Sequence, residues 1–135
     1  MDIKVPSLVG STPDKIARQA VKILLANKGI NTQLFDVSDT TVIADYYVIS
    51  TGRSTTHIKS LSDELIDKLS SAGISPSHVE GRGGGEWILI DFDNVIVHIF
   101  GKEAREFYTL ERLLGNHTDI ADIEEELDRE MSASE

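Results

Sequence analysis

Cysteine is absent from this sequence, and long hydrophobic runs are absent as well. Without cysteine the chain can form neither a disulfide framework nor a thiolate metal site. No apolar run approaches the roughly 18 residues that a membrane-spanning helix needs. The first residues also lack the charged start and the long apolar stretch of a secretory signal. We therefore expect a cytoplasmic protein with no membrane partner.

Positive charge is scarce in this chain. Lysine and arginine total 13 against 23 aspartates and glutamates, so the formal net charge is −10. Residues 119–135 contain eight of the carboxylates and a single arginine. Such a surface repels phosphate backbones, so direct DNA binding is not expected, whereas it suits a basic protein partner. Solubility alone would explain the same charge.

Helical spacing of apolar residues predicts two helices in the first half of the chain. The first should run from a cap near residue 12 to about residue 28, and the second should follow a strand and extend to about residue 72. Small polar residues, an early proline and glycines mark their ends. The expected terminal residues are Ser11 or Thr12, Pro13, Gly29, Ser54 and Gly73.

Five segments show strand patterns, and together with the helices they predict an α/β fold in which helices flank a mixed β-sheet. Asp93-Asn94 is a tight hairpin signal between the last two strands. The expected strands cover residues 32–37, 45–51, 78–80, 87–92 and 94–100.

The last part of the chain predicts a short helix over residues 105–114 and an acidic tail. Ile120, Ile123 and Leu127 recur at near-helical spacing, so the tail can form an amphipathic helix, whereas residues 132–135 are expected to be disordered. We divide the chain into an N-terminal extension, one domain and the tail, over residues 1–11, 12–116 and 117–135.

Two glycine-containing segments resemble parts of nucleotide sites. The loop at residues 81–85 precedes a strand pattern rather than a helix, so it predicts a flexible connection rather than a phosphate loop. Gly52-Arg53-Ser54 is the better anion site, because it follows a strand directly and begins a helix, where backbone N–H groups point outward.

Asp91 and Asp93 could complete such a site as magnesium ligands, which is the chemistry of a nucleotidyltransferase. Asp93 lies beside Asn94 in the expected turn, however, and the turn would direct it away from Asp91. We therefore expect no catalytic, metal or cofactor site, and we keep a magnesium-dependent nucleotidyltransferase using Asp91 and Asp93 as the alternative function.

His98 is the histidine most deeply placed within an apolar pattern. Strand alternation over residues 95–100 places it on one face of the sheet with Ile96 and Phe100. No H-x-x-x-H or H-x-H pair occurs, so a histidine metal site has little support. A hydrogen-bonded structural residue is the expected role of His98.

Several segments taken in order resemble one known family. They are Asp45-Tyr46-Tyr47-Val48-Ile49, Thr51-Gly52-x-Ser54-x-x-His57, Glu80-Gly81, Trp87-Ile88-Leu89-Ile90-Asp91, Val95-Ile96-Val97-His98-Ile99-Phe100 and Arg105-x-x-Tyr108-x-Leu110-Glu111-x-Leu113. Over about residues 12–114 the chain resembles the ribosomal silencing factor family, also called RsfS or Iojap-like proteins.

The resemblance implies a nucleotidyltransferase-like fold that lacks the catalytic site, and therefore a protein that is not an enzyme. It implies binding to the large ribosomal subunit through a basic ribosomal protein on the subunit-joining face. Docking there would block the small subunit sterically and repress translation. The family also implies a role in large-subunit maturation, and a homodimer.

The resemblance also indicates which residues contact the partner. Trp87 is the only tryptophan and is the favoured anchor, although core packing would explain it too. Leu114 stands where the family usually has an aromatic residue, and Arg105 and Glu111 are expected to pair locally. The expected partner-binding residues are Trp87, His98, Tyr108, Leu113 and Leu114.

Overall fold

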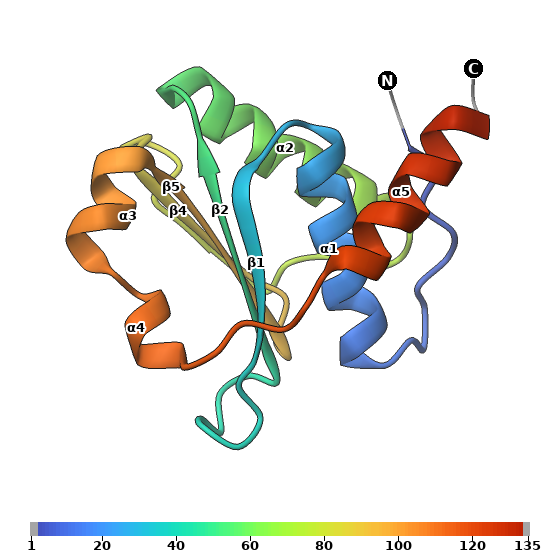
Figure 1. The fold of residues 1–135 in the computed structure, drawn as a ribbon, viewed down its shortest axis with the longest axis horizontal. Coiled ribbons are helices and arrows are strands. Elements are labelled where there is room, and N and C mark those ends of the chain that lie inside the picture. The colour runs from blue at the N-terminus through green and yellow to red at the C-terminus, as the bar shows by residue number, and fades with distance from the viewer. Residues whose placement is uncertain (1–2, 134–135) are drawn as a thin grey trace.

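The protein is described here by a computed structural model covering residues 3–133, apart from the side chains of Phe107 and Tyr108. A five-stranded sheet forms the centre of the fold (Figure 1). Its strands, in spatial order, are β1 (Ile30–Asp36), β2 (Tyr46–Gly52), β5 (Val95–Gly101), β4 (Trp87–Asp91) and β3 (His78–Glu80). Strands β2 and β5 are parallel and the other neighbours are antiparallel, so the predicted mixed α/β sheet is confirmed.

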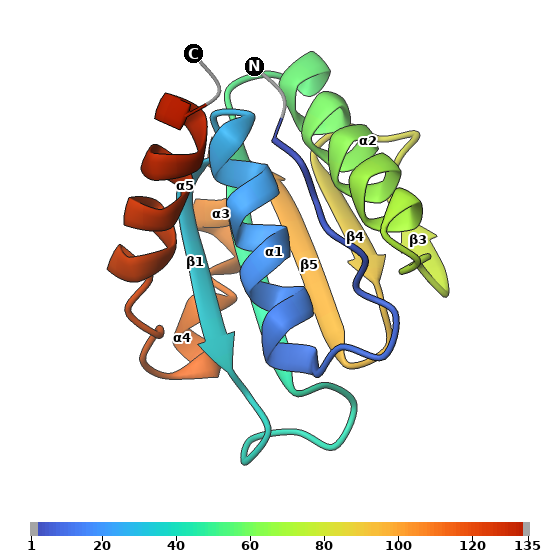
Figure 2. The ribbon, with the colours of Figure 1, turned by 90° about the vertical axis from the view of Figure 1, so that its right-hand side faces the viewer.

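The helices cover the two faces of the sheet unequally. Helices α1 (Pro13–Ala26), α2 (Thr55–Ser71) and α5 (Ala121–Ala133) form a layer on one face. Figure 2 shows these three helices in front of the sheet, with α3 (Lys102–Tyr108) and α4 (Glu111–Leu114) behind it. None of the described helices is long and apolar enough to cross a membrane.

Strand alternation divides the apolar side chains of the sheet between two clusters. In β5, Val95, Val97 and Ile99 pack in the main core beneath α1 and α2, whereas Ile96 and Phe100 belong to a smaller cluster on the opposite face. This is the predicted alternation. Each fully buried aliphatic or aromatic side chain contributes about 1.5–3 kcal/mol, so the main core supplies most of the stabilisation.

The helix ends confirm most of the expected signals. The Ser54 hydroxyl accepts the His57 backbone N–H at 3.1 Å and caps α2, and Gly73 has a φ of +98° just beyond the end of that helix. For α1 the prediction was wrong by one residue, because Lys28 takes the left-handed conformation (φ +66°). Gly29 instead donates its N–H to the Leu24 carbonyl at 2.8 Å and lies against Ser50, where a Cβ would clash.

The single helix predicted over residues 105–114 is wrong in its start and its continuity. Helix α3 begins at Lys102, directly after β5, and Thr109 interrupts the helix with a φ of +45° before α4 begins. Arg105 and Glu111 pair across this break, with Nε and Oε2 2.9 Å apart, as expected. The ion pair therefore spans two short helices rather than one turn of a continuous helix.

The C-terminal segment forms the expected amphipathic helix. Ile123 and Leu127 of α5 are buried against the main core, and Ile120 packs beside them. The disorder predicted for residues 132–135 is wrong for Ser132 and Ala133, which are helical, and residues 134–135 lie outside the described part. The apolar face of this segment therefore packs against the main core.

Candidate protein-docking surface

Aromatic side chains gather on the sheet face opposite α1 and α2. This aromatic face consists of Tyr47 from β2, Trp87 and Leu89 from β4, and His98 and Phe100 from β5. Tyr47, Trp87 and Leu89 are half-buried, whereas His98 and Phe100 are buried. Because every second residue of a strand points to the same face, the three neighbouring strands bring these five side chains together.

Trp87 is held in place by its neighbours. Its ring stacks on Phe100 with centroids 4.9 Å apart, and its Nε1–H donates a hydrogen bond to His98 Nδ1 at 3.1 Å. The Tyr47 and His98 ring centroids are 5.2 Å apart. The tryptophan is thus fixed in one orientation while part of its surface stays accessible.

His98 is the hydrogen-bonded structural residue that its strand position predicted. Burial lowers the pKa of its imidazole from 6.5 to about 4, so the ring is neutral near pH 7. An indole N–H can only donate, so Nδ1 is the acceptor and the proton of the neutral ring is on Nε2. Nε2 is buried and has no hydrogen-bond partner among the described residues.

The structure brings some of the expected partner-binding residues together and separates others. Trp87 and His98 are in contact, and Leu114 packs at the edge of the same apolar cluster. Leu113 points to solvent with 74% of its surface exposed. Tyr108 ends α3, and its side chain lies outside the described part.

Two members of the aromatic face were missed by the sequence reasoning. Tyr47 and Leu89 stand beside Trp87 and His98 on neighbouring strands, with Leu89 directly opposite His98 in the β4–β5 register. Strand alternation in the sequence could have identified Leu89, because Leu89 follows Trp87 by two residues and so lies on the same face. Their proximity to His98 required the strand order as well.

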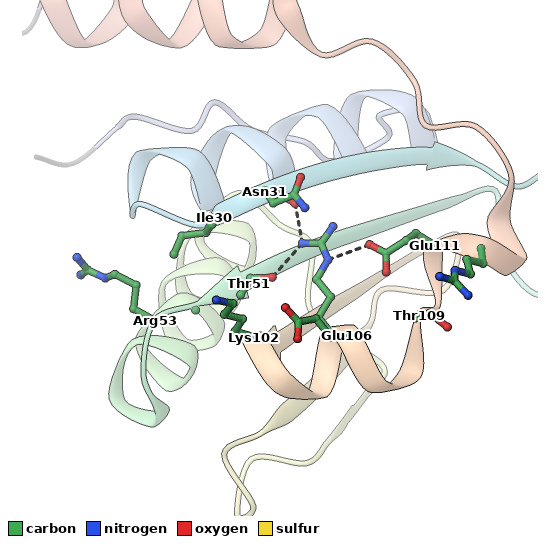
Figure 3. Close-up of a pocket in the computed structure, with 11 residues that line it drawn as sticks. Ile30, Asn31, Thr51, Arg53, Lys102, Glu106, Thr109 and Glu111 are labelled. Atoms are coloured by element: carbon green, nitrogen blue, oxygen red, sulfur yellow. Dashed lines mark hydrogen bonds and ion pairs between the residues drawn. The ribbon is translucent and has the colours of Figure 1, made fainter.

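Arg105 attaches α3 to the sheet. Its guanidinium is buried and donates to the Asn31 carbonyl, Thr51 Oγ1, Gln33 Oε1 and Glu111 Oε2 at 2.7–2.9 Å. Three of these contacts are drawn in Figure 3. One side chain therefore joins α3, β1, β2 and the start of α4, and it positions the segment that contains Leu113 and Leu114.

The carboxylates considered for magnesium lie far from the better anion site. Asp91 Oδ1 accepts the Asp93 backbone N–H at 2.7 Å, so it stabilises the hairpin turn. Asp91 is opposite Ile96, whereas Gly52 is opposite Gly101, so the two groups stand at opposite ends of β5, roughly 17 Å apart. The described residues contain no group of three or more His, Cys, Asp or Glu side chains placed to hold a metal ion.

Comparison with known proteins agrees with this fold. The family described as "Ribosomal silencing factor during starvation" matches residues 11–135. The ribosomal silencing factor RsfS of Zymomonas mobilis subsp. mobilis is 30% identical over 103 residues, which is 76% of this chain and 77% of that protein. A crystal structure of a protein from Chromobacterium violaceum has a TM-score of 0.76 and 30% identity, over 80% of this chain and 90% of that one.

A more distant relative is found in a eukaryote. "Mitochondrial assembly of ribosomal large subunit protein 1" of Mus musculus is 32% identical over 72 residues, covering 51% of this chain and 32% of that protein. The family match extends over nearly the whole chain, and the solved relative shares the fold. This chain therefore belongs to the ribosomal silencing factor family.

Proposed function

We propose that this protein silences translation by binding the large ribosomal subunit at its joining face and excluding the small subunit by volume. Family membership supports ribosome-associated silencing of translation. The steric mechanism needs no catalytic group, only a stable position on the subunit. A role in maturation of the large subunit is part of the same proposal, supported by the name of the mouse relative.

The observation that carries the docking proposal is the half-exposed aromatic face. Tryptophan and tyrosine are enriched among the residues that contribute most to protein–protein binding. Trp87 is already fixed by Phe100 and His98, so little side-chain entropy is lost when a partner covers it. Leu113 and Leu114 on α4 extend the apolar contact beyond the sheet.

The charge of the molecule favours a protein partner over ribosomal RNA. A net charge of −10 attracts a basic ribosomal protein and is repelled by phosphodiester backbones. We therefore propose that a basic ribosomal protein on the joining face contacts Trp87, Tyr108, Leu113 and Leu114, and that buried His98 supports this contact by holding Trp87. Contact through these few residues would keep the docking site small, and the rest of the molecule would then cover the surface where the small subunit binds.

The test is a subunit-joining assay with purified subunits, read by sucrose-gradient sedimentation. Wild-type protein in molar excess should co-sediment with large subunits and reduce the joined fraction. Trp87→Ala should lose most of both effects, because it removes the proposed anchor. Val9→Ala is the matched control, since Val9 is exposed beside Gly73 at the end of α2, away from the aromatic face. Unchanged joining with wild-type protein would refute the mechanism.

We further propose that the free protein is a cytoplasmic homodimer, as the family resemblance implies. Sedimentation equilibrium of the purified chain should give twice the monomer mass. A monomer at all concentrations would contradict the dimer and leave the docking proposal standing, because the joining assay measures docking separately.

A further inference from the structure

A cavity of about 610 Å³ lies at the carboxyl ends of β2 and β5, apart from the aromatic face. These two strands are parallel neighbours, and the helices that follow them, α2 and α3, pack on opposite faces of the sheet. In open α/β sheets, such a divergence opens a crevice outside the strand ends, and ligands bind there. Figure 3 shows the cavity lined from β1, β2, α3 and the segment that follows α3.

The charge inside this cavity is opposite to that of the whole molecule. Arg53, Lys102 and Arg112 line it and form no ion pair with any side chain that the structure describes. Arg105 is neutralised by Glu111, which leaves Glu106 as the one other lining carboxylate. Three unpaired cations in a chain of net charge −10 concentrate positive potential at one place. The cavity therefore suits an anion.

The size and lining of the cavity indicate what kind of molecule carries the anionic group. Its volume falls within the range of small-molecule sites. Ile30, with 43% of its surface exposed, supplies an apolar wall, and Thr51 and Thr109 supply hydroxyl groups. A bare phosphate ion would leave most of this volume empty, so an organic body attached to the anion is favoured.

The first turn of α2 adds donors at one end of the cavity. Ser54 and Thr55 border a second hollow that shares Gly52, Arg53 and Lys102 with the first. Two carboxylates, Glu86 and Glu103, also line that second hollow, so the anion is expected on its Arg53 side, toward the first cavity. Backbone N–H groups in the first turn of a helix have no backbone partner within the helix and favour negative charge. At the start of α2 the His57 N–H is already capped by Ser54 and the Arg53 N–H donates to His57 Nδ1, so the donors that remain are those of Thr55 and Thr56. Lys102 and Arg53 thus stand where the cavity meets a helix N-terminus.

We propose that this cavity binds a small organic phosphate of nucleotide size. The phosphate lies between Arg53, Lys102 and the start of α2, and the organic body extends along Ile30 toward Arg112. The chemistry of a phosphate is shared with the RNA backbone, and competition between a nucleotide and an oligoribonucleotide distinguishes the two ligands. Asp91 and Asp93 take no part, because they lie at the other end of β5.

Isothermal titration of the full-length protein without ribosomes or magnesium tests this site. ATP and GTP are the probes, with adenosine and inorganic pyrophosphate as partial ligands. We expect saturable one-to-one binding of at least one nucleotide, with adenosine much weaker. The double variant Arg53→Glu/Lys102→Glu should lower the affinity by about tenfold or more, since charge-assisted hydrogen bonds are lost. Arg129→Glu makes half of this charge change at an exposed position on α5 and should have no effect.

Three results would overturn the proposal. They are no saturable binding of either nucleotide, equal binding by wild type and the double variant, or displacement by a short oligoribonucleotide without terminal phosphates as effective as by ATP. The last result would assign the cavity to ribosomal RNA. Circular dichroism of the variants confirms that their fold is intact. The titration contains no ribosomes, so its failure would not affect the docking proposal.

Discussion

His98 and Arg105 illustrate how buried residues prepare a surface without belonging to its exposed part. His98 and Phe100 are buried beneath Trp87 and hold its ring by a hydrogen bond and by stacking. Arg105 is buried as well and fixes the α3–α4 segment through four acceptors. Each of these arrangements has a measurable consequence for stability.

Burial of neutral His98 should make stability depend on pH. Its folded pKa of about 4 lies below the usual 6.5, so the unfolded chain binds the proton first as the pH falls. Stability should therefore be complete above about pH 6.5 and decrease toward pH 4, by on the order of 3 kcal/mol. Urea unfolding at several pH values measures the change.

His98→Phe is the control for the pH experiment. Phenylalanine keeps the ring stacking but cannot be protonated, so the slope between pH 6.5 and 4 should flatten. Asp36 and Asp122 have pKa values lowered from 3.8 by hydrogen bonds to Ser38 and Arg18, and they titrate identically in both proteins. An equal slope in wild type and variant would contradict the assignment to His98.

Removing Arg105 should loosen the α3–α4 segment. Arg105→Met leaves the Asn31 carbonyl, Thr51 and Gln33 without their donor and Glu111 without its cation. We expect a loss of about 2–4 kcal/mol in the free energy of unfolding. Lysine should not restore it, because one ammonium group cannot reproduce the planar donor geometry. Arg112→Met, at an exposed position, should change stability by less than about 0.5 kcal/mol. A similar small loss for Arg105→Met would contradict this role.

At the scale of elements, the acidic C-terminal segment forms helix α5 and packs on the rest of the domain. Two of its apolar residues enter the main core, and its carboxylates meet the basic residues of α1. Arg18 lies 2.7 Å from Asp122, and Lys22 lies 3.0 Å from Glu126 and 2.9 Å from Glu130. Part of the negative charge therefore holds two helices together and is not available for attracting a partner.

The carboxylates around Lys22 should contribute to stability because the Lys22 side chain is only 8% exposed. Glu126→Gln/Glu130→Gln leaves that charge unpaired, and we expect a loss of about 1–2 kcal/mol, reduced by the partial exposure of the glutamates. Thermal unfolding measures it. Adding Lys22→Met should recover most of the loss, and failure to recover would show that the charge pair is not the cause.

At the scale of the whole molecule, the two faces of the sheet have different roles. Three helices cover one face and bury the main core, whereas α3 and α4 cover only part of the other. The incompletely covered face presents the aromatic residues on an otherwise acidic protein. Long-range electrostatic attraction should therefore affect mainly the association rate, whereas contact at the aromatic face should affect mainly the dissociation rate.

Salt should weaken docking mainly through the association rate. Raising the salt concentration from about 0.1 M to 0.5 M shortens the screening length, and we expect the association rate with large subunits to fall by about tenfold. Trp87→Ala should instead raise the dissociation rate, because it removes a desolvated contact. Surface-immobilised subunits allow both rates to be measured. An association rate independent of salt would contradict electrostatic attraction to a basic partner.

Local patterns in the sequence determined most elements and the faces of the strands. The Ser54 cap, the Asp93-Asn94 turn and the alternation around His98 depend on neighbouring residues, so the sequence was sufficient to predict them. The ordered motifs also predicted the family. These features follow from backbone geometry and side-chain periodicity within a few residues.

Only the tertiary structure decided features that depend on distant segments. The break at Thr109, the packing of α5 on α1, and the four acceptors around Arg105 involve residues far apart in the chain or without a local signal. Strand order brought Tyr47 and Leu89 to His98, separated Asp91 from Gly52, and opened the cavity at the carboxyl ends of β2 and β5. The physical reason is that periodicity determines which face a side chain occupies, whereas sheet topology determines which side chains meet there.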